Sequence, residues 1–115
     1  MLSPNIQRVL QLQSEICKTL SNPKRLEILH ELRGGEKTVG ELAASLRLRQ
    51  ANVSQHLASM RLRKIVIERR VGNTVYYRIV DHRINNACDI MQSVLIDQAN
   101  ADSKLVRLAV VSNRR

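Results

Sequence analysis

Hydrophobic residues recur at helical spacing near both ends of the chain, and each stripe predicts an amphipathic helix. The first stripe begins at Ile6 and continues to Leu20, so we expect that helix to stop before Asn22. From about Asp81 the helical period returns, with apolar residues at i, i+4, i+7 and i+11: Ile84, Cys88, Met91 and Leu95.

Two short helices are expected between these ends. Asn22-Pro23 is typical of a helix start, because asparagine caps a first turn and proline suits the first helical position. Gly34-Gly35 predicts the end of that helix. Thr38-Val39-Gly40-Glu41 has the form of a capping box and predicts another helix to about Leu46.

Residues 50 to 63 predict a further helix after the connector Arg47-Leu48-Arg49. Val53, Leu57 and Met60 lie at i, i+4 and i+7, so this stripe should face inward. The opposite face and its flanks then carry small and polar residues: Ala51, Asn52, Ser54, Gln55, Ala58 and Ser59.

A β pattern follows, in which residues 65–71 and 74–79 flank Gly72-Asn73 and predict a two-stranded hairpin with a tight turn. A lone hairpin is marginally stable, so it should pack on the helices. The expected fold is mainly α with a small β-hairpin. It is a winged helix-turn-helix of about five helices plus a two-stranded wing, with residues 1–100 forming the DNA-binding and dimerisation domain and residues 101–115 a tail or helix extension.

Composition narrows the function. The 115 residues carry a net charge of +9, and the stretch from residue 47 to 78 holds eight basic side chains against Glu68 alone. Two tyrosines are the only aromatic residues, which argues against a protein that stacks single-stranded bases. No apolar run is long enough for a membrane span and the N-terminus lacks a secretory profile, so we expect a cytoplasmic protein without a membrane partner.

The basic stretch coincides with the expected recognition helix and wing, which predicts contacts with double-stranded DNA. Gln55 is suited to reading a base, whereas Arg49, Arg69 and Arg70 would neutralise phosphates. Other expected contacts are a base or phosphate for Gln50 and Ser54, close approach to base edges for Ala51 and Ser59, and the minor groove or its backbone for Asn73 and Thr74.

Four segments together resemble the ArsR/SmtB family of repressors: Ser21 to Leu29, Thr38 to Leu42, Asn52 to Leu57 and Arg69 to Ile79. The match covers roughly Cys17 to Ala87 in one order and with similar spacing. The resemblance implies a homodimeric repressor that binds a pseudo-palindromic operator and leaves it when an effector binds. It also implies that the first and last helices form the dimer interface.

Two positions depart from the family pattern. Arg49 stands where the family usually has a Ser or Thr that caps the recognition helix, and a cation there opposes the helix dipole unless a phosphate compensates it. Lys64 stands where the family usually has Gly at the end of that helix.

The family's known effector sites are not reproduced. The segment from Val39 to Ala44 has no cysteine for an arsenic site, and the second-helix position of a sulfur-sensing cysteine pair is His30. The positions of the family's zinc ligands on the last helix read Asp81, Arg83, Val94 and Asp97, a poor set for zinc. We therefore predict no metal or cofactor.

Two interpretations of Cys17 and Cys88 stay open. Each lies on an apolar stripe, where a thiol serves as a small hydrophobic residue. Alternatively, the two thiols approach one another within or across a dimer and form a redox switch or soft-metal sensor.

Alternatives also remain for the whole protein. The sequence offers no nucleophile–base pair, phosphate loop or paired catalytic carboxylates, which argues against an enzyme. The rivals to an inducible repressor are a regulator that responds to no effector and a basic architectural protein that binds nucleic acid without reading its sequence.

Overall fold

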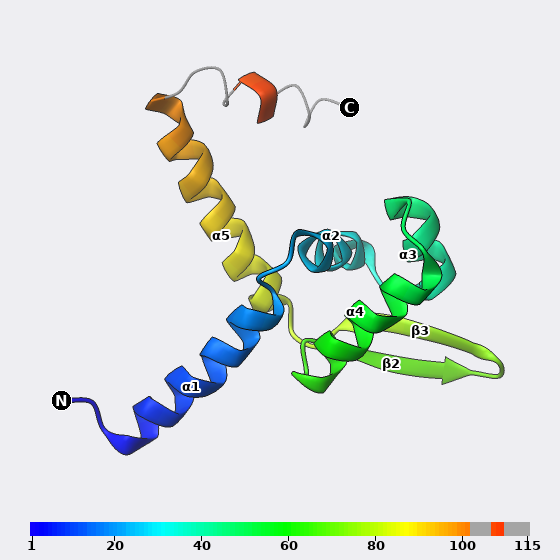
Figure 1. Cartoon of the computed structure of the whole chain (residues 1–115), viewed down its shortest axis with the longest axis horizontal. Coiled ribbons are helices and arrows are strands. Elements are labelled where there is room, and N and C mark those ends of the chain that lie inside the picture. Colours follow the sequence, from blue (N-terminus) through cyan, green and yellow to red (C-terminus); the bar gives the residue numbers. More distant parts are fainter. Residues whose placement is uncertain (102–106, 110–115) are drawn as a thin grey trace. The chain divides into compact units, whose positions relative to one another are not determined.

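The structure is a computed structural model that describes residues 1–101 and 107–109. Its α-helices, coloured along the chain in Figure 1, are α1 (Pro4–Thr19), α2 (Pro23–Glu31), α3 (Val39–Leu46), α4 (Gln50–Leu62) and α5 (His82–Gln98). The strands are β1 (Lys37–Thr38), β2 (Val66–Val71) and β3 (Thr74–Ile79), and 3₁₀ turns follow α2 at Leu32–Gly34 and α5 at Ala99–Ala101. The chain divides into two units, Met1–His82 and the residues from Arg83 onward.

Side-chain caps begin the first three helices. The Asn22 side-chain oxygen accepts hydrogen bonds from the backbone N–H groups of Lys24 and Arg25, at 2.9 and 3.3 Å. Thr38 and Glu41 form the predicted capping box, each side chain accepting from the other residue's backbone N–H. The Ser3 hydroxyl caps α1 by accepting a hydrogen bond from the backbone N–H of Ile6 at 3.3 Å. The predicted starts at Pro23 and near Thr38 are therefore confirmed.

The predicted hairpin is also confirmed, and a third strand joins it. β2 and β3 pair antiparallel from Val66↔Ile79 to Val71↔Thr74, around a turn in which Gly72 has a φ of +60°. β1 adds to the other side of β3, so the sheet order is β1-β3-β2 and the expected two-stranded wing extends into a three-stranded sheet. A two-residue strand is too short to show a period in the sequence.

One hydrophobic core holds α2, α3, α4 and the base of the wing together. All three residues of the predicted inward stripe of α4 are completely buried, as expected. The other core side chains come from α2 to β3: Ile28, Leu29, Leu32, Leu42, Ala43, Ile65, Val66 and Ile79. The core therefore fixes one face of α4 and leaves its opposite face to the surface.

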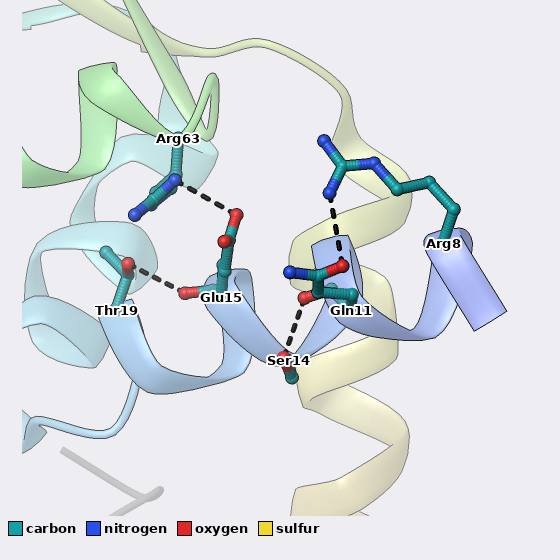
Figure 2. Close-up of polar contacts among 6 residues, drawn as sticks. All are labelled: Arg8, Gln11, Ser14, Glu15, Thr19 and Arg63. Carbon is teal, nitrogen blue, oxygen red and sulfur yellow. Dashed lines mark hydrogen bonds and ion pairs between the residues drawn. The ribbon is translucent and has the colours of Figure 1, made fainter.

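An ion pair joins the C-terminal end of α1 to the end of α4, and a hydrogen bond within α1 lies beside it. Figure 2 shows the Arg63 guanidinium, just after α4, donating to the Glu15 carboxylate at 3.0 Å. The hydroxyl of Thr19 donates to the backbone carbonyl of Glu15 at 2.9 Å. Much of the rest of α1 is exposed, including its apolar residues Ile6, Val9, Leu10 and Leu12.

α5 belongs to the second unit and also carries exposed apolar side chains: Ile90, Met91, Val94, Leu95 and Ile96. No helix within the described residues is both long and apolar enough to cross a membrane. The tail expected over residues 101–115 falls mostly on positions 102–106 and 110–115, which lie outside the described residues.

Candidate nucleic-acid interface

The exposed face of α4 presents small and polar side chains close to its N-terminus. Gln50, Ala51, Ser54 and Gln55 are all exposed, as the sequence predicts. Within the described part of the chain, the side chains of Gln50, Ser54 and Gln55 form no hydrogen bond. Because the opposite face of α4 is held in the core, these free amide and hydroxyl groups have a fixed direction in which to meet a partner.

The N-terminus of α4 is suited to an anion. Arg49 occupies the N-cap with extended backbone and no side-chain cap, as its departure from the family pattern predicts. The first turn therefore presents unsatisfied backbone N–H groups next to a cation. A phosphate group at this position would accept hydrogen bonds from these N–H groups and neutralise the charge of Arg49.

Ser59 lies in a different environment from the one expected. Its side chain is half-buried, and its hydroxyl accepts a hydrogen bond from Arg25 of α2 at 3.4 Å. The same guanidinium donates to Nδ1 of His56 at 3.1 Å. The sequence pattern placed Ser59 on the outward face, whereas the structure directs its hydroxyl to a neighbouring helix.

The two wing arginines differ in what they contact. Arg69 donates to both carboxylate oxygens of Glu36, with Nε 3.1 Å from one of them, and its guanidinium lies 5.1 Å from the centre of the Tyr76 ring. The hydrogen bond from Arg69 lowers the pKa of Glu36, so this carboxylate remains charged. Arg70 is exposed and forms no side-chain hydrogen bond or ion pair with any described residue.

A further arginine links α4 to the wing. Arg61 pairs with Glu68 of β2 at 2.7 Å, and the hydroxyl of Tyr77 lies 3.5 Å from the same carboxylate. Burial, followed by the charge of Glu68, raises the pKa of Tyr77, so the phenol stays protonated. No local sequence pattern indicates this link, because its partners belong to separate elements.

The basic stretch is therefore partly neutralised by the protein itself. Three of its eight cations have carboxylate partners, namely Arg61, Arg63 and Arg69. Among the described residues, the side chains of the other five form no ion pair: Arg47, Arg49, Lys64, Arg70 and Arg78. Asn73 and Thr74 are exposed at the tip of the wing.

The cysteines are placed in separate units. Cys17 is exposed on α1 and Cys88 is half-buried on α5. Across residues 1–101 and 107–109, no three His, Cys, Asp or Glu side chains gather in a way that could hold a metal ion.

The model of the family described as bacterial regulatory protein, arsR family, matches residues 22–66, from the cap of α2 to the start of β2. The transcriptional activator HlyU of Vibrio cholerae is 35% identical over 85 residues, which are 74% of this chain and 78% of HlyU. The chain belongs to the ArsR family.

A solved structure of a possible member of this family has the same fold. A homodimeric winged helix-turn-helix DNA-binding domain from Mycobacterium bovis, described as a possible ArsR-family regulator, superposes with a TM-score of 0.77 at 26% identity, covering 87% of this chain and 93% of that one. The HTH-type transcriptional repressor SmtB of Mycobacterium tuberculosis is 33% identical over 82 residues. That match spans 71% of this chain and 61% of SmtB.

Proposed function

We propose that this ArsR-family chain is a cytoplasmic, homodimeric repressor that binds double-stranded operator DNA with α4 in the major groove. The observation that carries the proposal is the division of α4 into two faces. Val53, Leu57 and Met60 are completely buried, while Ser54 and Gln55 are exposed without partners within the described chain. An amide such as that of Gln55 can form two hydrogen bonds with one adenine edge.

Affinity for the DNA backbone would come from the five unpaired cations. Arg47 and Arg49 lie in the turn before α4, and Arg70 lies on the wing that follows it. Unpaired positive charges therefore occur both before and after α4 along the chain. Phosphate contacts position a protein on DNA without reading its sequence. Asn73 and Thr74 would add contacts from the wing tip to the adjacent backbone or minor groove.

Dimerisation would involve α1 and α5. Each helix carries several exposed apolar residues that a partner would remove from water, and large exposed apolar patches mark interaction sites in general. The similar domain from Mycobacterium bovis is described as homodimeric. Two copies related by a two-fold axis would read a pseudo-palindromic site.

The experiment that tests this function selects double-stranded fragments from a randomised pool by repeated binding, and then compares selected with random DNA at fixed salt. We expect the protein to bind the selected DNA about 10³-fold or more tightly than random DNA. Gln55→Ala should reduce that preference, whereas Arg70→Ala should weaken binding to all DNA and lower the salt slope by about one. Failure to enrich any fragment, with similar affinity for all DNA, would indicate an architectural protein instead.

The same assay tests release by an inducer. Cys17 and Cys88 carry the thiols through which an oxidant, persulfide or arsenite would act. We expect these reagents to weaken binding to the selected DNA in the wild type and not in Cys88→Ser. Equal affinity before and after treatment would leave a regulator that does not respond through these thiols.

A further inference from the structure

One guanidinium connects three helices of the DNA-binding unit. Arg25 of α2 donates from Nη1 to the backbone carbonyl of Thr19, at the end of α1, over 3.0 Å. It donates from Nε to Nδ1 of His56 at 3.1 Å and from Nη2 to the hydroxyl of Ser59 at 3.4 Å. His56 and Ser59 lie on α4, so all three nitrogens of this side chain are used to join α1 to α4.

These contacts provide something that the core does not. Contacts of Val53, Leu57 and Met60 fix which face of α4 is buried, but the hydrophobic effect is non-directional and opposes small rotations of the helix only weakly. A planar guanidinium, by contrast, fixes the direction of each hydrogen bond it donates. Because His56 follows Gln55 directly in α4, a rotation of the helix that broke these bonds would also turn Gln55.

We propose that Arg25 is a positioning residue that sets the rotation of α4 and thereby aims Gln55 at the DNA. The inference rests on the proposed DNA-binding function. Arg25 itself need not touch DNA, because it acts through His56 and Ser59. Its removal should therefore reduce discrimination between sequences more than it reduces general affinity.

The contact also fixes the chemical state of His56. Nδ1 accepts a hydrogen bond, so it must carry a lone pair, and the neutral ring then has its proton on Nε2. Burial, followed by the positive charge of Arg25, lowers the pKa of His56 below its ordinary value of 6.5. Protonation at Nδ1 would remove the acceptor and place two cations in contact.

The two arginines at the C-terminal end of α4 are already paired with carboxylates. Arg61 binds Glu68 of β2, and Arg63 binds Glu15 of α1. Among the described residues, Arg25 is the charged group that hydrogen-bonds to the imidazole. Acidification toward the lowered pKa of His56 should therefore loosen the contact between Arg25 and α4.

The lowered pKa of His56 determines how folding stability changes with pH. The unfolded chain binds a proton at His56 at a higher pH than the folded chain does, so folding stability falls as the pH drops below about 6.5. If the contact aims α4, the preference for selected DNA should fall in the same range. A protonated histidine that merely added charge near phosphates would instead strengthen binding to all DNA.

The first experiment needs no DNA. Nitrogen NMR of the imidazole of His56 should show an unprotonated Nδ1 in the wild type, and Arg25→Gln should raise the pKa of His56 because its cationic neighbour is lost. The matched control is Lys24→Gln, which removes the adjacent cation of α2, whose side chain is exposed and pairs with Glu27 at 3.1 Å. An unchanged histidine pKa in Arg25→Gln would overturn the contact itself.

The second experiment measures binding to selected and random DNA. Arg25→Gln should lower the ratio of the two affinities about tenfold, the equivalent of one charged hydrogen bond. Arg25→Lys should not restore the ratio, because lysine lacks the fork, and Lys24→Gln should leave it unchanged. An equal loss of affinity for both kinds of DNA in Arg25→Gln would show that Arg25 supplies only charge or stability.

A conservative variant separates positioning from titration. In His56→Asn the side-chain oxygen is attached to Cγ, as Nδ1 is, so it can accept from Arg25 without titrating. We expect this variant to keep the preference and to lose its pH dependence, whereas His56→Leu should lose the preference. If the wild type enriches no DNA fragment, the proposed function is wrong. The NMR experiment still tests the contact between Arg25 and His56, because it uses no DNA.

Discussion

Helix α4 and the wing use polar groups in different ways. The exposed N-terminal half of α4 carries neutral amides and a hydroxyl without partners among the described residues, while its C-terminal half is tied by Arg25, Arg61 and Arg63. The wing carries two adjacent arginines, of which Arg69 is held by Glu36 and Arg70 is free of ion pairs within the described chain.

Under the proposed function, this difference would separate specificity for a DNA sequence from general affinity for DNA. Neutral groups on a rigid helix can discriminate between base edges, because a mismatch leaves their hydrogen bonds unmade. Cations on a hairpin attract every sequence alike. Under the proposed function, Glu36 would reduce that general attraction, and the contribution of the wing to affinity would depend on how strongly the Glu36 carboxylate holds Arg69.

The largest expected effect comes from loosening the packing of α4. Leu57 is completely buried, so Leu57→Ala should lower the free energy of unfolding by about 2–5 kcal/mol. Val71 on the wing is 50% exposed, and Val71→Ala should change the free energy of unfolding by less than about 0.5 kcal/mol. Urea denaturation of both variants measures the contrast, and comparable losses would show that the wing is as tightly packed as the helix.

Releasing Arg69 should have a smaller effect, on binding rather than on folding. Glu36→Gln frees the guanidinium, so affinity for random DNA should rise and the salt slope should steepen by about one phosphate contact. Glu27→Gln is the matched control, since it makes the same charge change on α2, at an exposed pair with Lys24. If both variants gained affinity equally, net charge alone would explain the result.

The smallest effect concerns the junction between the two regions. Lys64 follows α4 with a φ of +59°, a left-handed conformation that strains a residue with a side chain. Lys64→Gly should therefore stabilise the fold by about 0.5–1 kcal/mol, after allowing for the added freedom of the unfolded chain. Thermal denaturation should show no such gain for Lys64→Ala, which removes the charge but keeps the strain.

Local signals predicted most of the fold. The caps at Asn22 and Thr38, the buried stripe of α4 and the turn at Gly72 are each encoded within a few residues, and all are observed. The sequence also anticipated that Arg49 would leave α4 without a side-chain cap. Such features depend on short-range chemistry, which a sequence displays directly.

Partners from distant elements could not be predicted in this way. Arg25 and His56 are 31 positions apart, and Arg69 and Glu36 are 33 apart, so neither pair has a local pattern. These two arginines change the expected site most. Arg25 of α2 hydrogen-bonds to the Ser59 hydroxyl, which was expected to face outward. Arg69 pairs with Glu36, although it was expected to be available to a phosphate. The contacts expected with DNA remain predictions for every site residue.

Thr38 belongs to a strand and also caps a helix. It ends β1, where it pairs with Tyr76 of β3, and it caps α3, the first helix of the helix-turn-helix. Tyr76 is in turn the cross-strand partner of Arg69. A force applied to the wing by a bent or displaced DNA backbone would thus pass across three strands into the start of α3. The wing is therefore mechanically connected to the helix-turn-helix. If α4 reads bases as proposed, the protein would set the distance between those bases and a phosphate bound by the wing.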